Sequence, residues 1–211
     1  MPFKNACFIS YRHGQKELME TFVRDFHKAL ENEVVPLTDL EVFVDWGRLT
    51  GGDFFNPALA RALCESVCLI VVFTPTYFSN THSYCAREYK GMEMLETQRL
   101  NLLGNPADKE HGLIIPIVLR SENSLPQEVK DHRQYHDFTK FSLVEKRLTK
   151  SREYAPTVRI IAEYINDRYR ALSVLSNDPC EGCETFALPT DDEIRPWLTG
   201  MLAAPAPFPG R

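Results

Sequence analysis

Residues 67–73 read VCLIVVF, an almost unbroken apolar run that is rich in β-branched side chains. Runs of this length between polar segments are typical of strands covered on both faces, as in parallel sheets. A second run, LIIPIVL, occupies residues 113–119. Both runs are far too short to span a bilayer. They therefore predict two buried strands at the centre of a parallel sheet.

Strand and helix patterns alternate outward from these two runs. Further strands are predicted at residues 6–11 (ACFISY), 41–45 (EVFVD) and 134–138 (QYHDF). Helices are predicted at residues 16–31, from Asn56-Pro57 to about Cys64, from a Ser83 cap to about Leu100, and at residues 157–172. Alternation of this kind implies crossover connections. The predicted fold is α/β, a flavodoxin-like open parallel five-stranded sheet with helices on both faces.

Composition and charge exclude several classes of protein. The 211 residues carry a formal net charge of −5, so no general basic field attracts nucleic acid or an anionic membrane. The N-terminal stretch MPFKNACFIS does not resemble a secretory signal. We therefore expect a cytoplasmic protein whose six cysteines are reduced thiols, with Cys7, Cys64 and Cys68 as small core residues.

Two short motifs resemble metal or redox sites but lack the required context. Cys180 and Cys183 form a single C-x-x-C, and no second ligand pair follows at zinc-finger spacing. His132 and His136 are four residues apart without the glutamate of a metalloprotease helix. We therefore predict no metal site, and treat these histidines as surface residues near a strand.

The residues that follow the first three strands are rich in aromatic and charged side chains. In an open parallel sheet, ligands bind at the carboxyl ends of the strands. The candidates at this edge are Tyr11, Arg12 and His13 after the first strand, Asp45, Arg48 and Phe54 after the second, and Tyr84 and Glu88 on the helix after the third. Such a set suits a ligand with flat rings and phosphates. The chain has no P-loop, no G-x-G-x-x-G, no acidic pair after its first strand and no G-x-S-x-G elbow.

Four stretches in order resemble TIR domains, the Toll/interleukin-1 receptor family. CFISYRHG resembles the first signature box, and EVFVDWGRLTGGDFFNPALARAL resembles the second strand, the BB loop and the next helix. SVCLIVVFTPTYFSNTHSYCAREY is similar to the third strand and the helix with the active-site acid, and LIIPIVL to the fourth strand. The resemblance covers residues 4–172 and implies one TIR domain there, followed by a Pro-rich tail at residues 173–211.

The resemblance also implies an activity. NAD-cleaving members carry the pattern W-C-x-x-E on this helix, and here Tyr84, Cys85 and Glu88 occupy those positions, with Tyr in place of Trp. Glu88 would be the catalytic carboxylate, a fixed anion that stabilises the cationic ribose formed as nicotinamide leaves. Cys85 is interpreted as a packing residue. Arg12 and Arg48 would contact the pyrophosphate, Phe54 and Tyr84 would stack on a ring, and Tyr11, His13 and Asp45 would line the same rim. Trp46 is interpreted as a loop anchor.

The resemblance thus implies an NAD+ glycohydrolase that releases nicotinamide and linear or cyclic ADP-ribose, with NAD+ as substrate and no cofactor. It further implies a stand-alone bacterial-type protein in innate immune or anti-phage defence. Self-assembly with other TIR domains, as a homo-oligomer or filament, would activate it when the BB loop (residues 46–55) completes a neighbour's pocket.

Two other functions remain open: a non-enzymatic TIR adaptor, and a related nucleoside enzyme such as a deoxyribosyltransferase. The tail contains apolar islands at residues 186–188 and 197–202. We hypothesise that it docks an activating partner or senses a signal such as a second messenger.

Overall fold

The computed structural model of the chain describes residues 3–14, 16–46, 57–79, 82–141 and 152–203. Within them, five parallel strands form one sheet in the order β2-β1-β3-β4-β5. The strands are β1 (Asn5–Tyr11), β2 (Glu41–Val44), β3 (Ser66–Phe73), β4 (Ile114–Val118) and β5 (His136–Asp137). The longer helices are α1 (Lys16–Thr38), α2 (Pro57–Cys64), α3 (Tyr84–Leu102), α6 (Tyr154–Ser173) and α7 (Asp191–Ala203). Two short helices, α4 (Pro106–Lys109) and α5 (Gln127–His132), lie in the connections on either side of β4.

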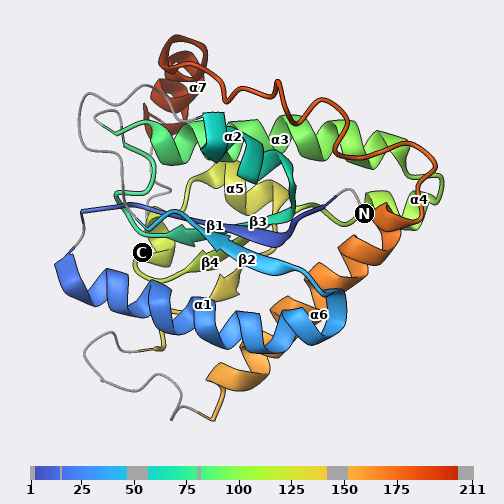
Figure 1. The fold of residues 1–211 in the computed structure, drawn as a ribbon. Coiled ribbons are helices and arrows are strands. Elements are labelled where there is room, and N and C mark those ends of the chain that lie inside the picture. The colour runs from blue at the N-terminus through green and yellow to red at the C-terminus, as the bar shows by residue number, and fades with distance from the viewer. Residues whose placement is uncertain (1–2, 15, 47–56, 80–81, 142–151, 204–211) are drawn as a thin grey trace.

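The helices cover both faces of the sheet, as the sequence predicted. Helices α1 and α6 pack together on one face, and α2 and α3 lie on the other (Figure 1). All eight residues of β3 are buried, which explains the unbroken apolar run at the centre of the chain. The fold class predicted from the sequence is therefore confirmed. Asn56, the predicted cap of α2, lies outside the described residues.

Helix α1 is longer than its predicted range of 16–31. Val34 continues the buried apolar stripe, and Pro36 lies within the last turn. The helix ends where Asp39 adopts a φ of 57° and its N–H donates to the carbonyl of Val35 at 2.8 Å. The prediction stopped too early because polar residues at 31–33 interrupt the visible periodicity.

Strand β5 is much shorter than its predicted range of 134–138. It pairs with β4 only through Ile117 with His136 and Val118 with Asp137. The N–H of Phe138 donates to the carbonyl of Val118, so the backbone polar groups of Val118 point toward β5. In a parallel sheet every second residue of a strand faces the same neighbour, so position 116 faces β5 as well. Proline has no N–H to offer there.

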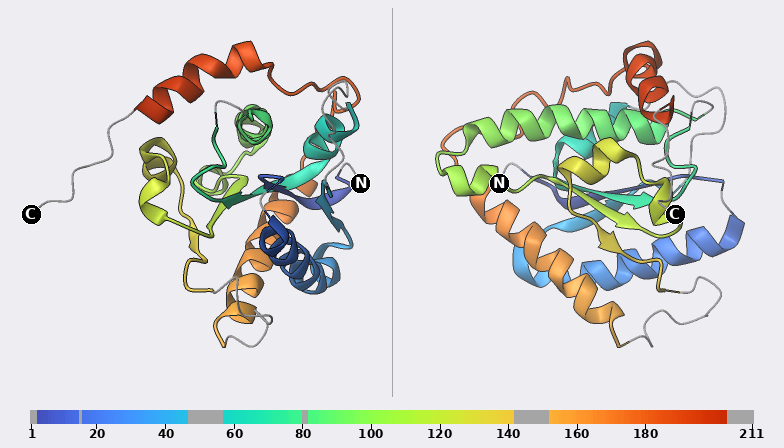
Figure 2. Two further views of the ribbon diagram at one scale, coloured as in Figure 1. Left: turned by 90° about the vertical axis from the view of Figure 1, so that its left-hand side faces the viewer. Right: turned by 180° about the vertical axis from the view of Figure 1, so that it is seen from behind.

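Residues 179–203, named here the C-terminal strap, run along the outer side of α3 and end in α7 (Figure 2). Four of its side chains are at most 3% exposed, namely Cys183, Leu188, Ile194 and Leu198. The sequence predicts only a tail here, because Pro196 and the surrounding turn-forming residues obscure the helical spacing of Ile194 and Leu198.

A disulfide joins Cys64, at the end of α2, to Cys183 of the strap. The prediction that all six cysteines are reduced thiols is therefore wrong for these two. The reason is that 119 residues separate them, and only the docking of the strap brings them together. Cys7 and Cys68 are free and fully buried, as expected of core residues.

Arg99 of α3 secures the same region. Its side chain is fully buried, and its guanidinium donates to the carbonyls of Cys64, of Ser66 at 2.8 Å and of Pro179 at 3.2 Å. One arginine thus joins the end of α2, the start of β3 and the start of the strap.

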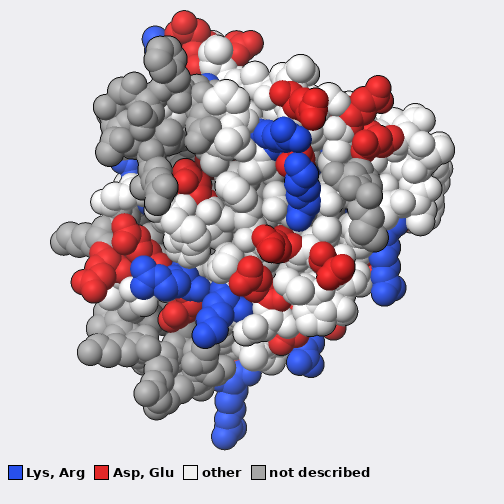
Figure 3. All heavy atoms as spheres, viewed as in Figure 1, with Lys and Arg blue, Asp and Glu red and all other residues white. Residues whose placement is uncertain are grey.

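Acidic and basic side chains are intermixed on the face of the molecule shown in Figure 3. Within the described ranges, no helix is both long and apolar enough to cross a membrane.

Candidate active site

The carboxyl ends of β1, β2 and β3 meet at one edge of the sheet. The parallel register pairs Ile9 with Val44 and Tyr11 with Val72, so the residues that follow these strands emerge side by side. Strand β1 lies between the other two, which makes this edge the point where the strand order reverses. The candidate site therefore forms where β1 ends.

Glu88 faces this edge from α3 and is only 7% exposed. The hydroxyl of Ser10 donates a hydrogen bond to Glu88 Oε2. The Ser10 hydroxyl also lies 2.7 Å from the hydroxyl of Tyr77, which is fully buried. Because serine has a single hydroxyl proton, Tyr77 donates to Ser10 while Ser10 donates to the carboxylate. Two hydroxyls in series therefore hold the Glu88 side chain against β1.

The pKa of Glu88 is raised to about 7. Burial is the main cause and the negative charge of Asp45 adds to it, whereas the Ser10 hydrogen bond and the charge of Arg87 act in the opposite direction. At neutral pH the side chain is therefore divided between its neutral and ionised forms. The description of Glu88 as a fixed anion is wrong for the ligand-free protein, because the sequence did not reveal how deeply the carboxyl group is buried.

Arg12 follows Ser10 by two residues, just past the end of β1, and the alternation of side chains along a strand puts the two on the same side. Its charge lowers the pKa of the Cys85 thiol, although burial raises that pKa well above its ordinary value, so Arg12 is close to the start of α3. The Nη1 atom of Arg12 is buried and has no hydrogen-bond partner within the described residues. A buried, unpaired guanidinium nitrogen is costly unless an anionic or polar ligand supplies an acceptor.

Tyr11 and His13 point to the opposite side, toward α1, because successive side chains alternate along a strand. Their rings are 4.2 Å apart, and His13 Nε2 lies 4.0 Å from Asp45 Oδ2. They line a cleft of about 440 Å³ whose other walls are Gly14, Glu20, Arg24 and Trp46. The sequence grouped Tyr11, Arg12 and His13 together, whereas the structure separates Arg12 from the other two.

Of the remaining predicted residues, the structure describes Tyr84, Cys85 and Trp46 but not Arg48 and Phe54. Tyr84 begins α3, is 37% exposed and lies 5.6 Å from the Arg87 guanidinium. Cys85 is buried beside Glu88, as expected of a packing residue. The Trp46 ring packs edge-on against His27 of α1, which agrees with the interpretation as a loop anchor. Arg48 and Phe54 lie outside the described residues.

Two residues of the site were missed, Ser10 and Tyr77. A signal was available for Ser10. It is the one serine in the stretch ACFISY at residues 6–11, which is otherwise made of apolar and aromatic residues. A hydroxyl buried in such a strand requires a partner. Nothing in the local sequence distinguishes Tyr77 from an ordinary core aromatic.

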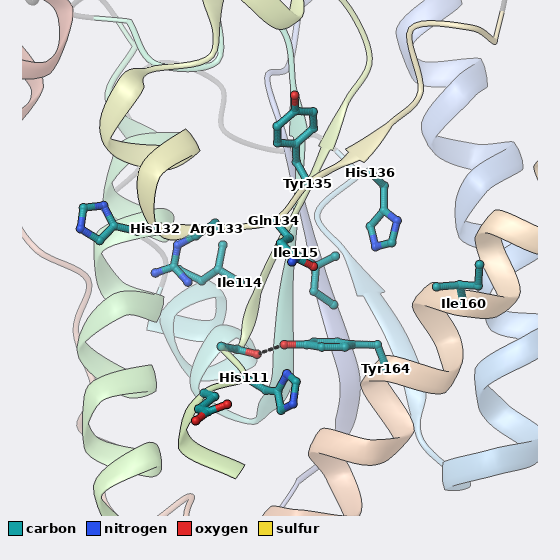
Figure 4. Close-up of a pocket in the computed structure, with 12 residues that line it drawn as sticks. His111, Ile114, Ile115, His132, Arg133, Gln134, Tyr135, His136, Ile160 and Tyr164 are labelled. Atoms are coloured by element: carbon teal, nitrogen blue, oxygen red, sulfur yellow. Dashed lines mark hydrogen bonds between the residues drawn. The ribbon is translucent and has the colours of Figure 1, made fainter. Parts of the chain in front are cut away.

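A cavity of about 580 Å³, larger than the cleft beside Tyr11 and His13, lies next to β4 and β5 on the far side of the sheet from β2 (Figure 4). His136 and Tyr164 face it, and the Tyr164 hydroxyl donates to the carbonyl of Gly112 at 2.7 Å. Arg133 also lines this cavity but is paired with Glu96 at 2.7 Å. None of the predicted site residues contributes to its wall.

The sequence model of the TIR domain family matches residues 7–150. The chain belongs to the TIR domain family. One similar solved structure is that of the TIR domains of the activated Roq1 resistosome directly recognizing the pathogen effector XopQ. It is 20% identical in sequence, with 85% of this chain and 94% of that chain covered and a TM-score of 0.36. No curated protein matches the chain.

In this TIR domain, the matched region contains β1 from Cys7 onward, the carboxyl edge of the sheet and the whole of α3. Ser10, Tyr77 and Glu88 all lie inside it. The strap, from Pro179 onward, lies beyond it.

Proposed function

We propose that this TIR domain is an NAD+ glycohydrolase that cleaves the bond between nicotinamide and ribose. The observation that supports this best is Glu88, an acid buried at the carboxyl edge of the sheet and held there by Ser10. A buried carboxyl group with a pKa of about 7 is typical of a functional site rather than of a solvated helix surface.

The chemistry requires a carboxylate at this place. As the bond breaks, its electron pair leaves with the nicotinamide nitrogen, and the ribose carbon becomes cationic. Ionised Glu88 would stabilise this charge and accept a hydrogen bond from a ribose hydroxyl. A water molecule then adds to the carbon and releases a proton, or an oxygen or nitrogen of the same molecule adds instead to give a cyclic product. The unpaired Nη1 of Arg12 would bind the pyrophosphate.

We further propose that self-assembly activates the enzyme, with residues 46–55 of one subunit completing the pocket of the next. The biological setting would be innate immune or anti-phage defence by NAD+ depletion or signal production, in the cytoplasm. Membership of the TIR family supports this part of the proposal.

Nicotinamide release should be measured over a range of protein concentrations. We expect turnover per chain to rise with concentration, because assembly completes the site. Glu88→Gln at the same concentrations serves as the control. Folded wild-type protein that releases no nicotinamide at any concentration would refute the enzymatic proposal and favour the non-enzymatic adaptor.

The pH dependence of kcat/KM is expected to have an acid limb with a midpoint near the Glu88 pKa of about 7. Because the ionised form is the active one, the rate rises as pH increases through this value, and at pH 6 it is about tenfold below the plateau. The measurement is nicotinamide release at subsaturating NAD+ between pH 5 and 9. A rate that is constant from pH 6 to 8 would contradict the assigned role.

A further inference from the structure

We propose that the C-terminal strap is a clamp that holds the first turns of α3, and thereby positions Glu88, with Trp197 as its main positioning residue. This inference rests on the proposed function. It assigns the segment beyond residue 173 a mechanical part in the reaction, in place of the docking or sensing role hypothesised from its sequence.

The strap binds the start of α3 through polar contacts. Ser83 is the N-cap residue of α3, as predicted, but its hydroxyl donates to Asp191 Oδ1 at 2.6 Å and makes no capping hydrogen bond to the helix. The Nε of Arg87 donates to the carbonyl of Pro189 at 2.5 Å, and its Nη1 lies 3.8 Å from Asp191. Arg87 directly precedes Glu88, so the backbone that carries the acid is tethered from its outer side.

Trp197 binds the residues that follow Glu88. Its ring is stacked on Tyr89, with centroids 5.8 Å apart and an angle of 10°, and it forms a T-shaped pair with Phe78, whose centroid is 5.7 Å away. The Lys90 ammonium lies 4.3 Å from the ring centroid. The indole N–H lies 3.0 Å from both carboxylate oxygens of Glu128 in α5, so Trp197 links α3 to a second helix.

Gly91, one turn after Glu88, allows the strap to approach the α3 backbone closely. A β-carbon at this position would lie 2.5 Å from Leu188 Cδ2 and 3.6 Å from Phe186 Cζ, both in the strap. The apolar side chains of the strap, together with Leu63 of α2 at 3.4 Å, therefore lie in the space that a side chain at position 91 would need.

The start of the strap is fixed independently. The Cys64–Cys183 disulfide and the hydrogen bond from Arg99 to Pro179 attach it to α2 and to the far end of α3. Glu88 faces Ser10 on the inner side of α3 while the strap holds Ser83, Arg87, Tyr89 and Lys90 on the outer side. The carboxylate is thus fixed between β1 and the strap.

The test compares wild type with Trp197→Ala, with Trp197→Phe as the conservative variant and Val174→Ala as the control. Val174 is 83% exposed and precedes the strap. We expect Trp197→Ala to lower kcat by about 10- to 100-fold with little change in KM, because misplacing a catalytic group by about 1 Å has effects of this size. Trp197→Phe should keep most of the wild-type kcat, because it retains an aromatic ring at this position. The kcat and KM of Val174→Ala should match those of the wild type.

Two further readouts separate positioning from a loss of folding. In Trp197→Ala the acid limb of the pH profile should move to lower pH, because water reaches Glu88 more easily. Amide hydrogen exchange at residues 84–92 should accelerate while exchange in β3 stays slow. Gly91→Leu, which displaces the strap from the α3 side and leaves Trp197 intact, should give the same changes.

The proposal is overturned if Trp197→Ala and Gly91→Leu keep the wild-type kcat and pH profile, or if either raises kcat, since a rise would make the strap an inhibitor. If wild-type protein releases no nicotinamide, the proposed function fails, and amide exchange alone then decides the clamp: unchanged exchange at residues 84–92 in both variants would overturn it.

Discussion

A Glu88→Gln variant is expected to lose nicotinamide release by about a hundredfold or more and, at pH 8, to be more stable than the wild type. The loss of rate follows from removing the only charge that the proposed mechanism places beside the cationic ribose, since single electrostatic groups at such positions have effects of this size. The gain in stability follows from burial, because glutamine has nearly the same shape and no charge to desolvate.

The sign of the stability effect follows from the pKa of Glu88. Its value in the folded protein, about 7, lies above the ordinary value of 4.5, so the folded state binds more protons than the unfolded state between these pH values. The wild type therefore loses stability as pH rises through this window, and the variant does not. The difference in free energy of unfolding is expected to be near zero at pH 4.5 and roughly 3 kcal/mol at pH 8.

Denaturant unfolding of both proteins at pH 5 and pH 8, together with the NAD+ assay, measures this effect. Glu163→Gln is a matched control, because Glu163 is an exposed residue of α6. A variant that is inactive and also less stable at pH 8 would indicate that Glu88 makes a structural ion pair. A variant that retains wild-type turnover would disprove the catalytic role.

A Cys64→Ser/Cys183→Ser double variant is expected to lose up to about 5 kcal/mol of stability, because the disulfide closes a loop whose ends are 119 residues apart. In the chain-entropy account, the crosslink restricts the unfolded chain more strongly as the loop grows. The same loss is expected when the wild type is reduced with dithiothreitol.

Unfolding curves with and without dithiothreitol measure this loss, and the double variant should be insensitive to the reductant. Thiol titration of the denatured, unreduced wild type should find only the four free cysteines, Cys7, Cys68, Cys85 and Cys180. Six titratable thiols in freshly purified protein, with no effect of dithiothreitol on stability, would show that the pair is reduced.

The sheet and its helices were predictable because their patterns are local. The apolar run at 67–73 and the four-residue spacing from Phe22 to Phe26 and Leu30 each lie within one element. The Cys64–Cys183 pair was not predictable, since it depends on where a distant segment docks. Helix α7 was hidden because Pro196 interrupts its pattern.

The site was predictable only in part. The resemblance to TIR domains identified Glu88, but the pKa of a carboxyl group depends on burial by side chains that the local sequence does not reveal. The contact of Ser10 with Glu88 spans 78 residues, so no spacing indicates it. The separation of Arg12 from Tyr11 and His13 follows from strand alternation and could have been foreseen, because adjacent residues on a strand face opposite ways.

The proline in β4 has a consequence for how copies of this chain can associate. Among the described residues, β4 pairs on its outer side only with the two residues of β5, and an unpaired stretch of strand edge can template the pairing of another chain, although all five residues of β4 are buried here. Pro116 has no backbone N–H, so a strand added at this edge would lack one of the hydrogen bonds that it needs to pair with β4. Stacking of copies through continuous intermolecular β-structure at this edge is thereby disfavoured, so a filament of this protein is expected to be built from contacts between helices and loops.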